Sequence, residues 1–373
     1  MQILGHDERG AATVSSTPSR KAYSVCELHL QQNRNDVLNI WKQSGLNVLE
    51  AKYSWMYENN PYGSATGWLV RDSGGQAVGF VALFPRGIKI NGKLHSSALV
   101  GDFVIIKEHR TLGPALMLQK AVVESRAKHN FDFIYGIPNR QAEVVLQRAG
   151  YRQVGPAIRM TRPFRSHYYL RRKLSSSLLA DTLAGAIDPI LHWTGKEVRQ
   201  SRNNRFRLEE MWDFDERFDD LSALVSDPLA IVGERNSAYL HWRYLRCPHK
   251  KYRIHALTDI STEQVLGFLV SYPTEDGIAI AELQAVEQPG VEELGVTDCL
   301  LSEFLRLQRR QMVDSVSISY FGNKRLAEKL KEYGFAHREA KQNLVVFAGP
   351  DARLADRLFD QHNWCLFEGD VDT

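Results

Sequence analysis

Cysteine is scarce in this chain, which has four cysteines among 373 residues and no Cys-x-x-Cys pair. A disulfide-stapled secreted domain and a cysteine-based zinc site are therefore disfavoured. Cys247-Pro248-His249 places two possible ligands close together, but this pair alone is too sparse for a metal centre. We expect reduced structural thiols and no bound metal.

The chain also lacks a large net charge, because 47 Lys and Arg residues are balanced by 44 Asp and Glu residues, giving +3. So small an excess does not indicate a nucleic-acid-binding protein, although it is compatible with a local anion site. No run of about 18 apolar residues is present, so no transmembrane helix is expected. The first residues contain no apolar core of a secretory signal, which favours a cytoplasmic protein. The oligomeric state is left open.

The chain does contain an internal repeat. Three blocks recur in the same order: W-x-Y at 55–57 and 242–244, AVGFVALFP at 77–85 and VLGFLVSYP at 265–273, and PNRQAEVVLQRAGY at 138–151 and GNKRLAEKLKEYGF at 322–335. The copies are separated by 184 to 188 residues. In the last block, Asn139 is suited to cap a helix and Gly150 to end it. Three blocks at nearly one spacing indicate a duplicated domain.

Strand and helix patterns alternate within each copy. The first copy predicts strands at 67–71, 77–84, 87–91, 98–106, 131–135 and 151–160, and helices at 113–128 and 139–149. The second copy repeats this order from about 253 to 348. Runs of strands followed by strand–helix alternation predict an α+β fold (an α/β mixed sheet) in each of two domains.

We expect five segments along the chain, namely a disordered N-terminal extension at 1–22, a first domain at 23–161, a connection at 162–205, a second domain at 206–349 and a tail at 350–373. The connection begins with RPFRSHYYLRRK, interpreted as a solvated face, with contact to an anionic membrane surface or an acidic carrier as the alternative. The tail carries Glu368, Asp370 and Asp372, interpreted as solvated rather than cation-binding.

A possible anion site lies in EHRTLGPALMLQKAV, residues 108–122, where Arg110 precedes Gly113 at the start of a predicted helix. A helix N-terminus presents unpaired N–H groups and a partial positive charge, so it suits an anion. The strand FVIIKEHR, the R-x-x-G-x-A motif from Arg110 to Ala115, and the Asn-headed helix ending in Gly-aromatic resemble the GNAT acyltransferase superfamily. The resemblance covers most of the chain and implies two GNAT-like domains.

The resemblance implies that the first domain binds acetyl-CoA or another acyl-CoA. The residues expected to contact it are Val104, Ile105, Arg110, Thr111, Leu112, Gly113, Ala115, Leu116 and Asn139. Pro114 departs from the motif because proline has no N–H to donate. In the second copy Gly295 stands near the place of Gly113, but Glu292 and Glu293 replace the basic character and would repel a phosphate. For Asn139, a plain helix cap is the alternative.

Asp102 is the expected general base, since it lies eight residues before Arg110 on the strand that the family places beside the thioester. The alternative is a strand-end carboxylate paired with a neighbour. Many family members carry a tyrosine acid seven residues after the helix Asn, but this chain has Leu146 there. Tyr135 is the expected substitute acid, with a packed aromatic residue as the alternative. A thiolate is also a fair leaving group without an acid.

Trp55, Tyr57 and Tyr62 precede the first strands, where this fold lines the acceptor site, so they are expected to bind the acceptor. The alternative is a packed aromatic cluster, because Trp242-x-Tyr244 repeats the pattern in the copy without a basic motif.

The sequence therefore predicts a tandem-domain acyltransferase that moves an acyl group from CoA to an amine. By analogy with the family, N-acetyl transfer to an amino sugar or a precursor of a surface polysaccharide is expected. Two rival hypotheses remain open at this point: a Fem-type transferase that uses aminoacyl-tRNA, and an acyl-CoA-binding protein without catalytic activity.

Overall fold

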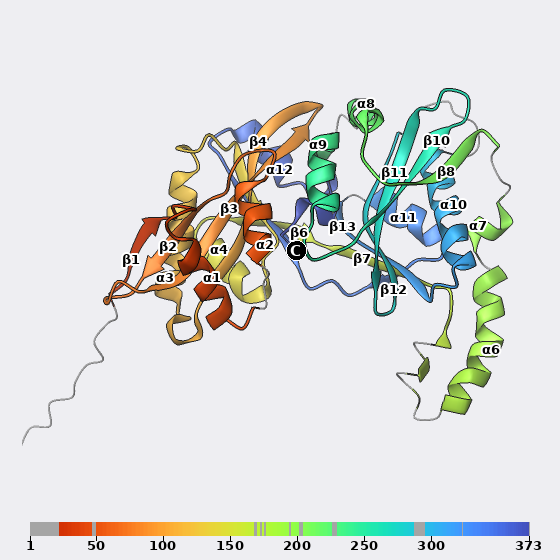
Figure 1. Cartoon of the computed structure of the whole chain (residues 1–373), viewed down its shortest axis with the longest axis horizontal. Coiled ribbons are helices and arrows are strands. Elements are labelled where there is room, and N and C mark those ends of the chain that lie inside the picture. Colours follow the sequence, from red (N-terminus) through yellow and green to blue (C-terminus); the bar gives the residue numbers. More distant parts are fainter. Residues whose placement is uncertain are drawn as a thin grey trace, which may run out of the picture.

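The computed structural model describes residues 22–46, 50–167, 170–171, 174, 177–193, 195–200, 204–225, 230–286, 295–322 and 324–372. The expectations for residues 1–21, for Glu292 and Glu293, and for Asn323 as a helix cap lie outside the described residues. The described chain forms two α/β domains side by side, with domain 1 at the left and domain 2 at the right of Figure 1.

Domain 1 is built on a mixed sheet. Its strands, in sheet order, are β1 (Ser24–Glu27), β2 (Thr66–Arg71), β3 (Ala77–Ile90), β4 (Lys93–Ile105), β5 (Phe133–Gly136), β15 (Asn343–Ala348) and β6 (Arg152–Pro156). Only β4 and β5 pair in parallel among these neighbours. Its helices are α1 (Arg34–Gln43), α2 (Glu50–Tyr53), π-helix η1 (Ser54–Glu58), 3₁₀ helix η2 (Lys107–His109), α3 (Leu112–Ser125) and α4 (Arg140–Arg148).

Domain 2 repeats this plan. Its strands, in sheet order, are β8 (Phe206–Met211), β10 (Arg253–Asp259), β11 (Val265–Thr274), β12 (Gly277–Ala285), β13 (Ser315–Gly322), β7 (Ile158–Pro163) and β14 (Ala336–Arg338). The parallel pair is β12 with β13, at the same place in the order. Its helices are α8 (Glu216–Leu224), α9 (Ser237–Leu240), π-helix η3 (His241–Leu245), α10 (Val296–Arg310) and α11 (Lys324–Glu332).

The two copies exchange one strand. The single strand expected at 151–160 is wrong: the chain forms β6 in domain 1, breaks at Ala157, and continues as β7 in the sheet of domain 2. In return, β15 of the second copy lies between β5 and β6 of domain 1. Each sheet is therefore completed by a strand from the other half of the chain.

β3 is one long strand where the sequence predicted two, at 77–84 and 87–91. Pro85 suggested a break, but it pairs opposite Ala98 of β4 inside the strand. Its carbonyl accepts a hydrogen bond from Asn60 Nδ2 at 2.9 Å, so the backbone of Pro85 faces away from β4. On that side the neighbouring strand β2 begins at Thr66, opposite Leu83, and does not reach Pro85. The missing N–H of the proline therefore breaks no hydrogen bond between strands.

The helix-capping prediction for the repeated block is confirmed in domain 1. The side-chain oxygen of Asn139 accepts from the N–H groups of Gln141 and Ala142, at 3.1 and 3.0 Å. Gly150 follows the helix with φ of 108°, a conformation that suits glycine. Gly334 has φ of 80° after α11, so both copies end this helix in the same way.

The C-terminal segment joins the two sheets, and its interpretation as a solvated tail is wrong. α12 (Ala352–Leu358) and the 3₁₀ helix η4 (Gln361–Asn363) lead into β16 (Trp364–Leu366), which pairs with β13 of domain 2. β16 also pairs with β9 (Ile231–Gly233), which in turn pairs with β3 of domain 1. The final 3₁₀ helix η5 (Glu368–Asp370) then turns the chain into the space between the domains.

Two tryptophans mark a pseudo-two-fold relation between the domains. Trp55 Nε1 donates to the carbonyl of Trp242 at 2.8 Å, and Trp242 Nε1 donates to the carbonyl of Trp55 at 2.9 Å. Their rings stack with centroids 5.2 Å apart, and both side chains are buried. The two residues occupy the same place in the repeat, on η1 and η3. Trp55 therefore belongs to a packed aromatic cluster, the alternative to its predicted role in binding the acceptor.

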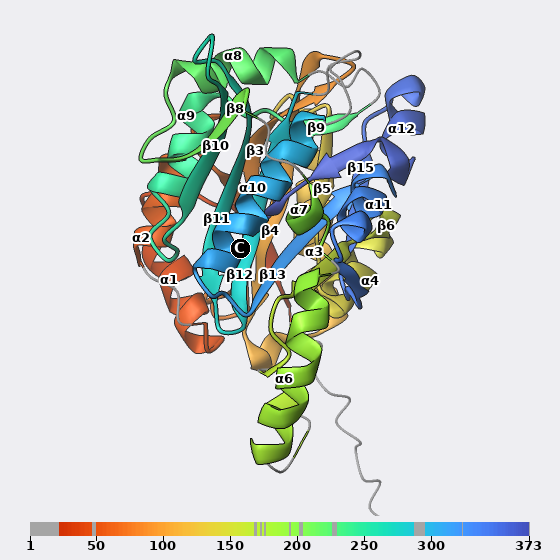
Figure 2. The ribbon, with the colours of Figure 1, turned by 90° about the vertical axis from the view of Figure 1, so that its right-hand side faces the viewer.

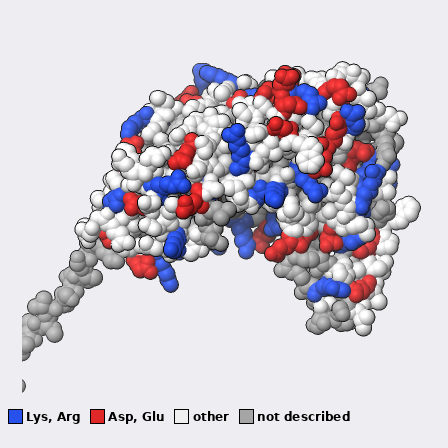
Figure 3. Space-filling model, viewed as in Figure 1, with Lys and Arg blue, Asp and Glu red and all other residues white. Residues whose placement is uncertain are grey.

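The connection between the copies includes α6 (Ser177–Trp193) and α7 (Lys196–Arg199), and α6 projects from the body of the molecule (Figures 1 and 2). None of the helices in the described parts of the chain is both long and apolar enough to cross a bilayer. On the face seen in Figure 3, Lys and Arg side chains are interspersed with Asp and Glu side chains.

Candidate functional site

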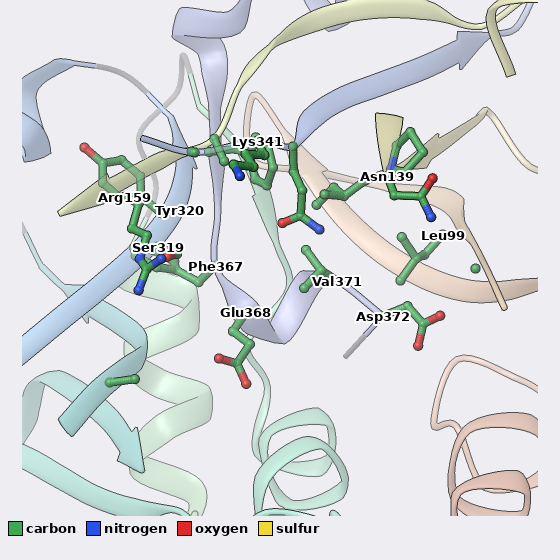
Figure 4. A pocket seen from close by; sticks show the side chains of 18 of the residues that line it. Leu99, Asn139, Arg159, Ser319, Tyr320, Lys341, Phe367, Glu368, Val371 and Asp372 are labelled. Atoms are coloured by element: carbon green, nitrogen blue, oxygen red, sulfur yellow. The ribbon is translucent and has the colours of Figure 1, made fainter. Parts of the chain in front are cut away.

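A cavity of about 920 Å³ lies between the two domains. Domain 1 contributes the end of β4 and the start of α4, and domain 2 contributes β12 and β13. Figure 4 shows Leu99 and Asn139 on one side and Ser319 and Tyr320 on the other, with Val371 of the C-terminal segment between them. The cavity is therefore walled by both copies and by the chain's last residues.

The cavity opens where the parallel pair of domain 1 separates. β4 and β5 pair from Ser97–Phe133 to Leu99–Tyr135, and β5 ends at Gly136 while β4 continues to Ile105. The segment of β4 beyond Leu99, residues 100–103, then lines the cavity. Backbone groups that have lost a neighbouring strand can bind a ligand in its place, except where another group already occupies them, as Asp372 does at the N–H of Asp102.

Asp102 lies on a bulge in this segment of β4. The register of the β3–β4 ladder shifts here, since Phe80 pairs with Val104 but Ala82 pairs with Gly101. Asp102 has φ of 45°, in the left-handed region that non-glycine residues rarely adopt. Bulges of this kind re-aim a side chain and are common beside active sites. The predicted base is thus placed on the cavity wall by a local irregularity.

The carboxylate of Asp102 is held by two neighbours. Tyr57 Oη donates to it at 2.8 Å, and Lys52 Nζ lies 3.2 Å from it. Burial, together with the negative charge of Asp372, raises the pKa of Asp102 to about 6, although Lys52 and Tyr57 act to lower it. A carboxylate with such a pKa is ionised at neutral pH and still basic enough to accept a proton.

Asp372 reaches this site from the end of the chain. Its Oδ2 accepts the backbone N–H of Asp102 at 3.0 Å, and its Oδ1 lies 3.3 Å from Lys52 Nζ. The approach is close because residue 101 is glycine: a Cβ there would meet Asp372 Oδ2 at 2.6 Å. Two carboxylates therefore share one lysine at the cavity wall.

The N-terminus of α3, the expected pyrophosphate site, has no acidic residue in its first turn, and Thr111 makes no side-chain cap. The N–H of Thr111 donates to His109 O at 2.7 Å, and Pro114 has none. By helix geometry, the orphan donors are then Leu112 and Gly113. These two residues are exposed, and within the described part of the chain no atom lies within 4 Å of a Cβ built on Gly113.

The other residues expected to contact CoA lie around this helix start or on β4. Ala115 is buried and Leu116 half-buried; because they follow the first three helical residues, their N–H groups belong to the helical ladder rather than to the orphan donors. Arg110 is exposed, and its Nε donates to the carbonyl of Ile105 at 3.0 Å. Val104 and Ile105 pair with β3 and do not line the cavity, because the part of β4 on the cavity wall ends at residue 103. Asn139 does line the cavity.

Four other expected site residues lie away from the cavity wall. Tyr135 is buried and its Oη donates to the carbonyl of Asp370 at 2.8 Å, while burial raises its pKa. Tyr62 Oη donates to Glu234 at 2.7 Å and so joins the two domains. Trp55 is buried in the domain interface. Tyr57 is not on the wall either, but it supports Asp102 from behind.

The structure adds residues to the site that the sequence did not assign to it, including Asp372, interpreted from the sequence as part of a solvated tail. Gln119 of α3, Tyr320 of β13 and Asp372 all line the cavity. Lys52 carries no sequence signal of its role, because its two carboxylate partners are 50 and 320 residues away. Leu146 also lines the cavity, which puts an apolar side chain where the family pattern has a tyrosine.

Solved structures share this architecture at low sequence identity. A GCN5-related N-acetyltransferase from Anabaena variabilis is 16% identical, with a TM-score of 0.61 over 87% of this chain and 72% of that chain. A tandem GNAT protein from the clavulanic acid biosynthesis pathway is 12% identical, with a TM-score of 0.53 over 88% and 100%. The Saccharomyces cerevisiae N-myristoyltransferase, solved with bound myristoyl-CoA, is 10% identical, with a TM-score of 0.55 over 93% and 85%. No protein-family model matches the chain, and neither does any curated protein sequence.

Proposed function

We propose that this chain, which has the fold of the GCN5-related N-acetyltransferases in two copies, is an acyl-CoA-dependent acyltransferase that acts on an amine. The observation that carries the proposal is the placement of Asp102. Its carboxylate lies on the cavity wall with a pKa of about 6, beside the point where β4 and β5 separate.

The acyl-CoA would lie along domain 1. The orphan N–H groups of Leu112 and Gly113 and the positive end of α3 suit a pyrophosphate. The gap between β4 and β5 then offers backbone groups to the arm that carries the thioester. The neighbour with bound myristoyl-CoA supports a CoA thioester as the donor.

The charge of the cavity wall supports an amine acceptor. Six carboxylates line the cavity, namely Asp102, Glu275, Asp276, Glu339, Glu368 and Asp372. The basic side chains on the described wall are Arg159 and Lys341. An excess of carboxylates attracts a protonated amine and disfavours an anionic acceptor.

In the proposed reaction, the Asp102 carboxylate takes a proton from the acceptor ammonium. The neutral nitrogen attacks the thioester carbonyl, a C–N bond forms, the C–S bond breaks and CoA leaves as the thiolate. The thiolate then takes the second proton that the nitrogen loses, so the products are the amide and the CoA thiol. Lys52 offsets part of the repulsion between Asp102 and Asp372, and Tyr57 fixes the orientation of Asp102. Acetyl as the acyl group, and an amino sugar or polysaccharide precursor as the acceptor, stay predictions, as does Tyr135 as the acid.

The test is to incubate the protein with acetyl-CoA and each of a panel of amines, and to measure turnover as the release of the CoA thiol. Asp102→Asn should bind CoA as the wild type does and turn over at least about 100-fold more slowly, since a positioned base contributes roughly 10²–10⁴-fold. Asp220→Asn on the exposed surface of α8 is the matched control and should be unchanged. Equal rates for Asp102→Asn and wild type would remove Asp102 from this role.

Leu146 on the cavity wall favours a second candidate, an acyl-CoA-binding protein without turnover, because the usual tyrosine acid is absent from that position. CoA binding with no thiol release for any amine would support this candidate over the first.

A further inference from the structure

Gln119 is a buried polar residue on the core-facing side of α3. It lies on the same face as Ala115, Leu118 and Val122, and its side chain is 0% exposed. Neither Oε1 nor Nε2 of Gln119 has a hydrogen-bond partner among the residues that the structure describes. A buried amide without partners is costly, and native proteins rarely keep one without a reason.

Gln119 is one of the residues that line the cavity, at its domain 1 end, although its amide atoms have no exposed surface. The wall around it is built from Val100 and Gly101 of β4, Ile137 after β5, and Ala142 and Leu146 of α4. These neighbours are apolar or have no side-chain polar atom, and Asp102 and Asn139 lie next to them on the same wall, so the amide of Gln119 is one of few polar groups at this end of the cavity. A polar ligand here would bind this amide once the side chain turns toward the cavity.

The chemistry of the amide limits what the ligand is. A primary amide donates two hydrogen bonds and accepts others, so its best partner offers both a carbonyl and an N–H. A charged partner would be disfavoured at this buried, apolar surface. The arm of CoA between the pyrophosphate and the sulfur carries two secondary amides and no charge.

The position of Gln119 along α3 agrees with this partner. It follows Leu112, the first residue of the helix, by seven positions. At 1.5 Å of rise per residue, the two lie roughly 10 Å apart along the helix axis. In the proposed binding mode the arm runs from a pyrophosphate at the helix start to the gap beside Asp102, and Gln119 is the α3 residue on the described cavity wall.

We propose that Gln119 is a positioning residue for the acyl donor, and that its side chain hydrogen-bonds an amide of the arm that joins the pyrophosphate to the sulfur. The inference rests on the proposed function. It predicts that Gln119 contributes to binding of CoA but not to binding of the nucleotide part alone.

The experiment is calorimetric titration of the full chain with CoA and with 3′-phosphoadenosine 5′-diphosphate, which keeps the pyrophosphate and has no arm. Gln119→Met keeps the length of the side chain and removes the amide. CoA affinity should fall about 10-fold, the change expected for one lost hydrogen bond, while nucleotide affinity stays the same. The melting temperature without ligand should be unchanged or higher, because the variant no longer buries unpaired polar atoms.

Gln308→Met is the matched control. Gln308 is a buried glutamine of α10, the corresponding helix of domain 2, its Oε1 is also without a partner in the described chain, and it is not part of the cavity wall. This variant should bind CoA as the wild type does. Gln119→Leu repeats the test with a different shape if the methionine variant does not fold.

Unchanged CoA affinity in a folded Gln119 variant would overturn the inference and leave the proposed function standing. A higher KM for the amine with unchanged CoA affinity would also overturn it, since the amide would then serve the acceptor. Parallel loss of CoA and nucleotide binding with a lower melting temperature would show a structural role instead. A wild-type protein that binds neither ligand would overturn the proposed function itself.

Discussion

The two domains carry the same tyrosine–carboxylate pair in different surroundings. Tyr57 donates to Asp102 in domain 1, and Tyr244 donates to Glu282 in domain 2, both at 2.8 Å. The side chain of Asp102 is 9% exposed and lines the cavity, whereas Glu282 is fully buried against Arg235. The duplicated domains thus carry carboxylates at equivalent positions. Asp102 reaches the cavity and is a candidate base, whereas Glu282 does not line the cavity and forms a buried ion pair.

The helix that follows the fourth strand differs in the same direction. α3 begins with an exposed, uncapped turn that has no acidic side chain. α10 begins at Val296, after the N-cap residue Gly295, and places Asp298 in its first turn, where Lys196 and Lys329 pair with it. Burial opposes ionisation of Asp298, but the two lysines outweigh it and lower its pKa. Domain 2 thus fills its own helix terminus with a carboxylate, so an external anion is expected only at domain 1.

The largest effect is expected from breaking the ion cluster of domain 2. Arg235 donates to Glu282 at 2.8 Å and to Asp370 at 2.9 Å, and all three side chains are at most 1% exposed. Arg235→Met should lower the free energy of unfolding by about 3–5 kcal/mol, because it leaves Glu282 buried without a counter-charge and Asp370 with Arg86 alone. Urea denaturation measures this value.

The control for this prediction is Arg205→Met. Arg205 also forms an ion pair, with Asp259, but its side chain is 56% exposed. It should cost less than about 1 kcal/mol. A loss as small for Arg235 as for Arg205 would mean that the cluster does not stabilise the joint between the domains.

The next effect concerns the two helix termini. Gly113→Glu has room for its side chain, so its effect on CoA is electrostatic. Two like charges 4 Å apart repel by about 1 kcal/mol in water and about 4 kcal/mol at an effective dielectric of 20. We expect an intermediate loss, about 100-fold in CoA affinity by calorimetry. Gly295→Glu should leave CoA affinity unchanged; an equal loss in both variants would place a CoA site in each domain.

A smaller effect sharpens the contrast between Asp102 and Glu282. With a pKa of about 6, Asp102 loses its basic form as pH falls, so kcat/KM should rise with pH through about 6 and level off above it. Lys52→Met removes a charge that lowers this pKa. The rise should therefore move to higher pH, with turnover at pH 7 reduced by less than about 10-fold. A profile that Lys52→Met does not shift would show that another group sets it.

The sequence was sufficient for the plan of the fold because its signals are local. The spacing between copies predicted two domains, and the cap at Asn139 and the turn at Gly150 define the same helix in the structure. Asp102 was predicted from the family resemblance, which places the base on the strand before the Arg110 motif; the structure puts Asp102 on the cavity wall, and its role as base stays a prediction.

Features that depend on distant partners were beyond the sequence. The pattern of β7 suits the sheet of either copy, so nothing local indicates that it pairs with β13 rather than with domain 1. Asp370 reads as part of a solvated tail until Arg86 and Arg235, 284 and 135 residues away, are seen to surround it. In the sequence, Gln119 is an ordinary polar residue on an apolar helix face. Only the structure shows that it lines the cavity and that its amide has no hydrogen-bond partner among the described residues.

The exchange of β7 and β15 has a consequence for how the chain comes apart. A cut in the projecting helix α6 would separate the sequence into two polypeptides, each holding one strand of the other's sheet. Neither polypeptide is a finished domain, so the pair should remain together as a heterodimer with interlocked arms until denaturant releases both at once. We therefore expect that the two halves do not need the connection at α6 to stay associated, because the exchanged strands β7 and β15 hold them together.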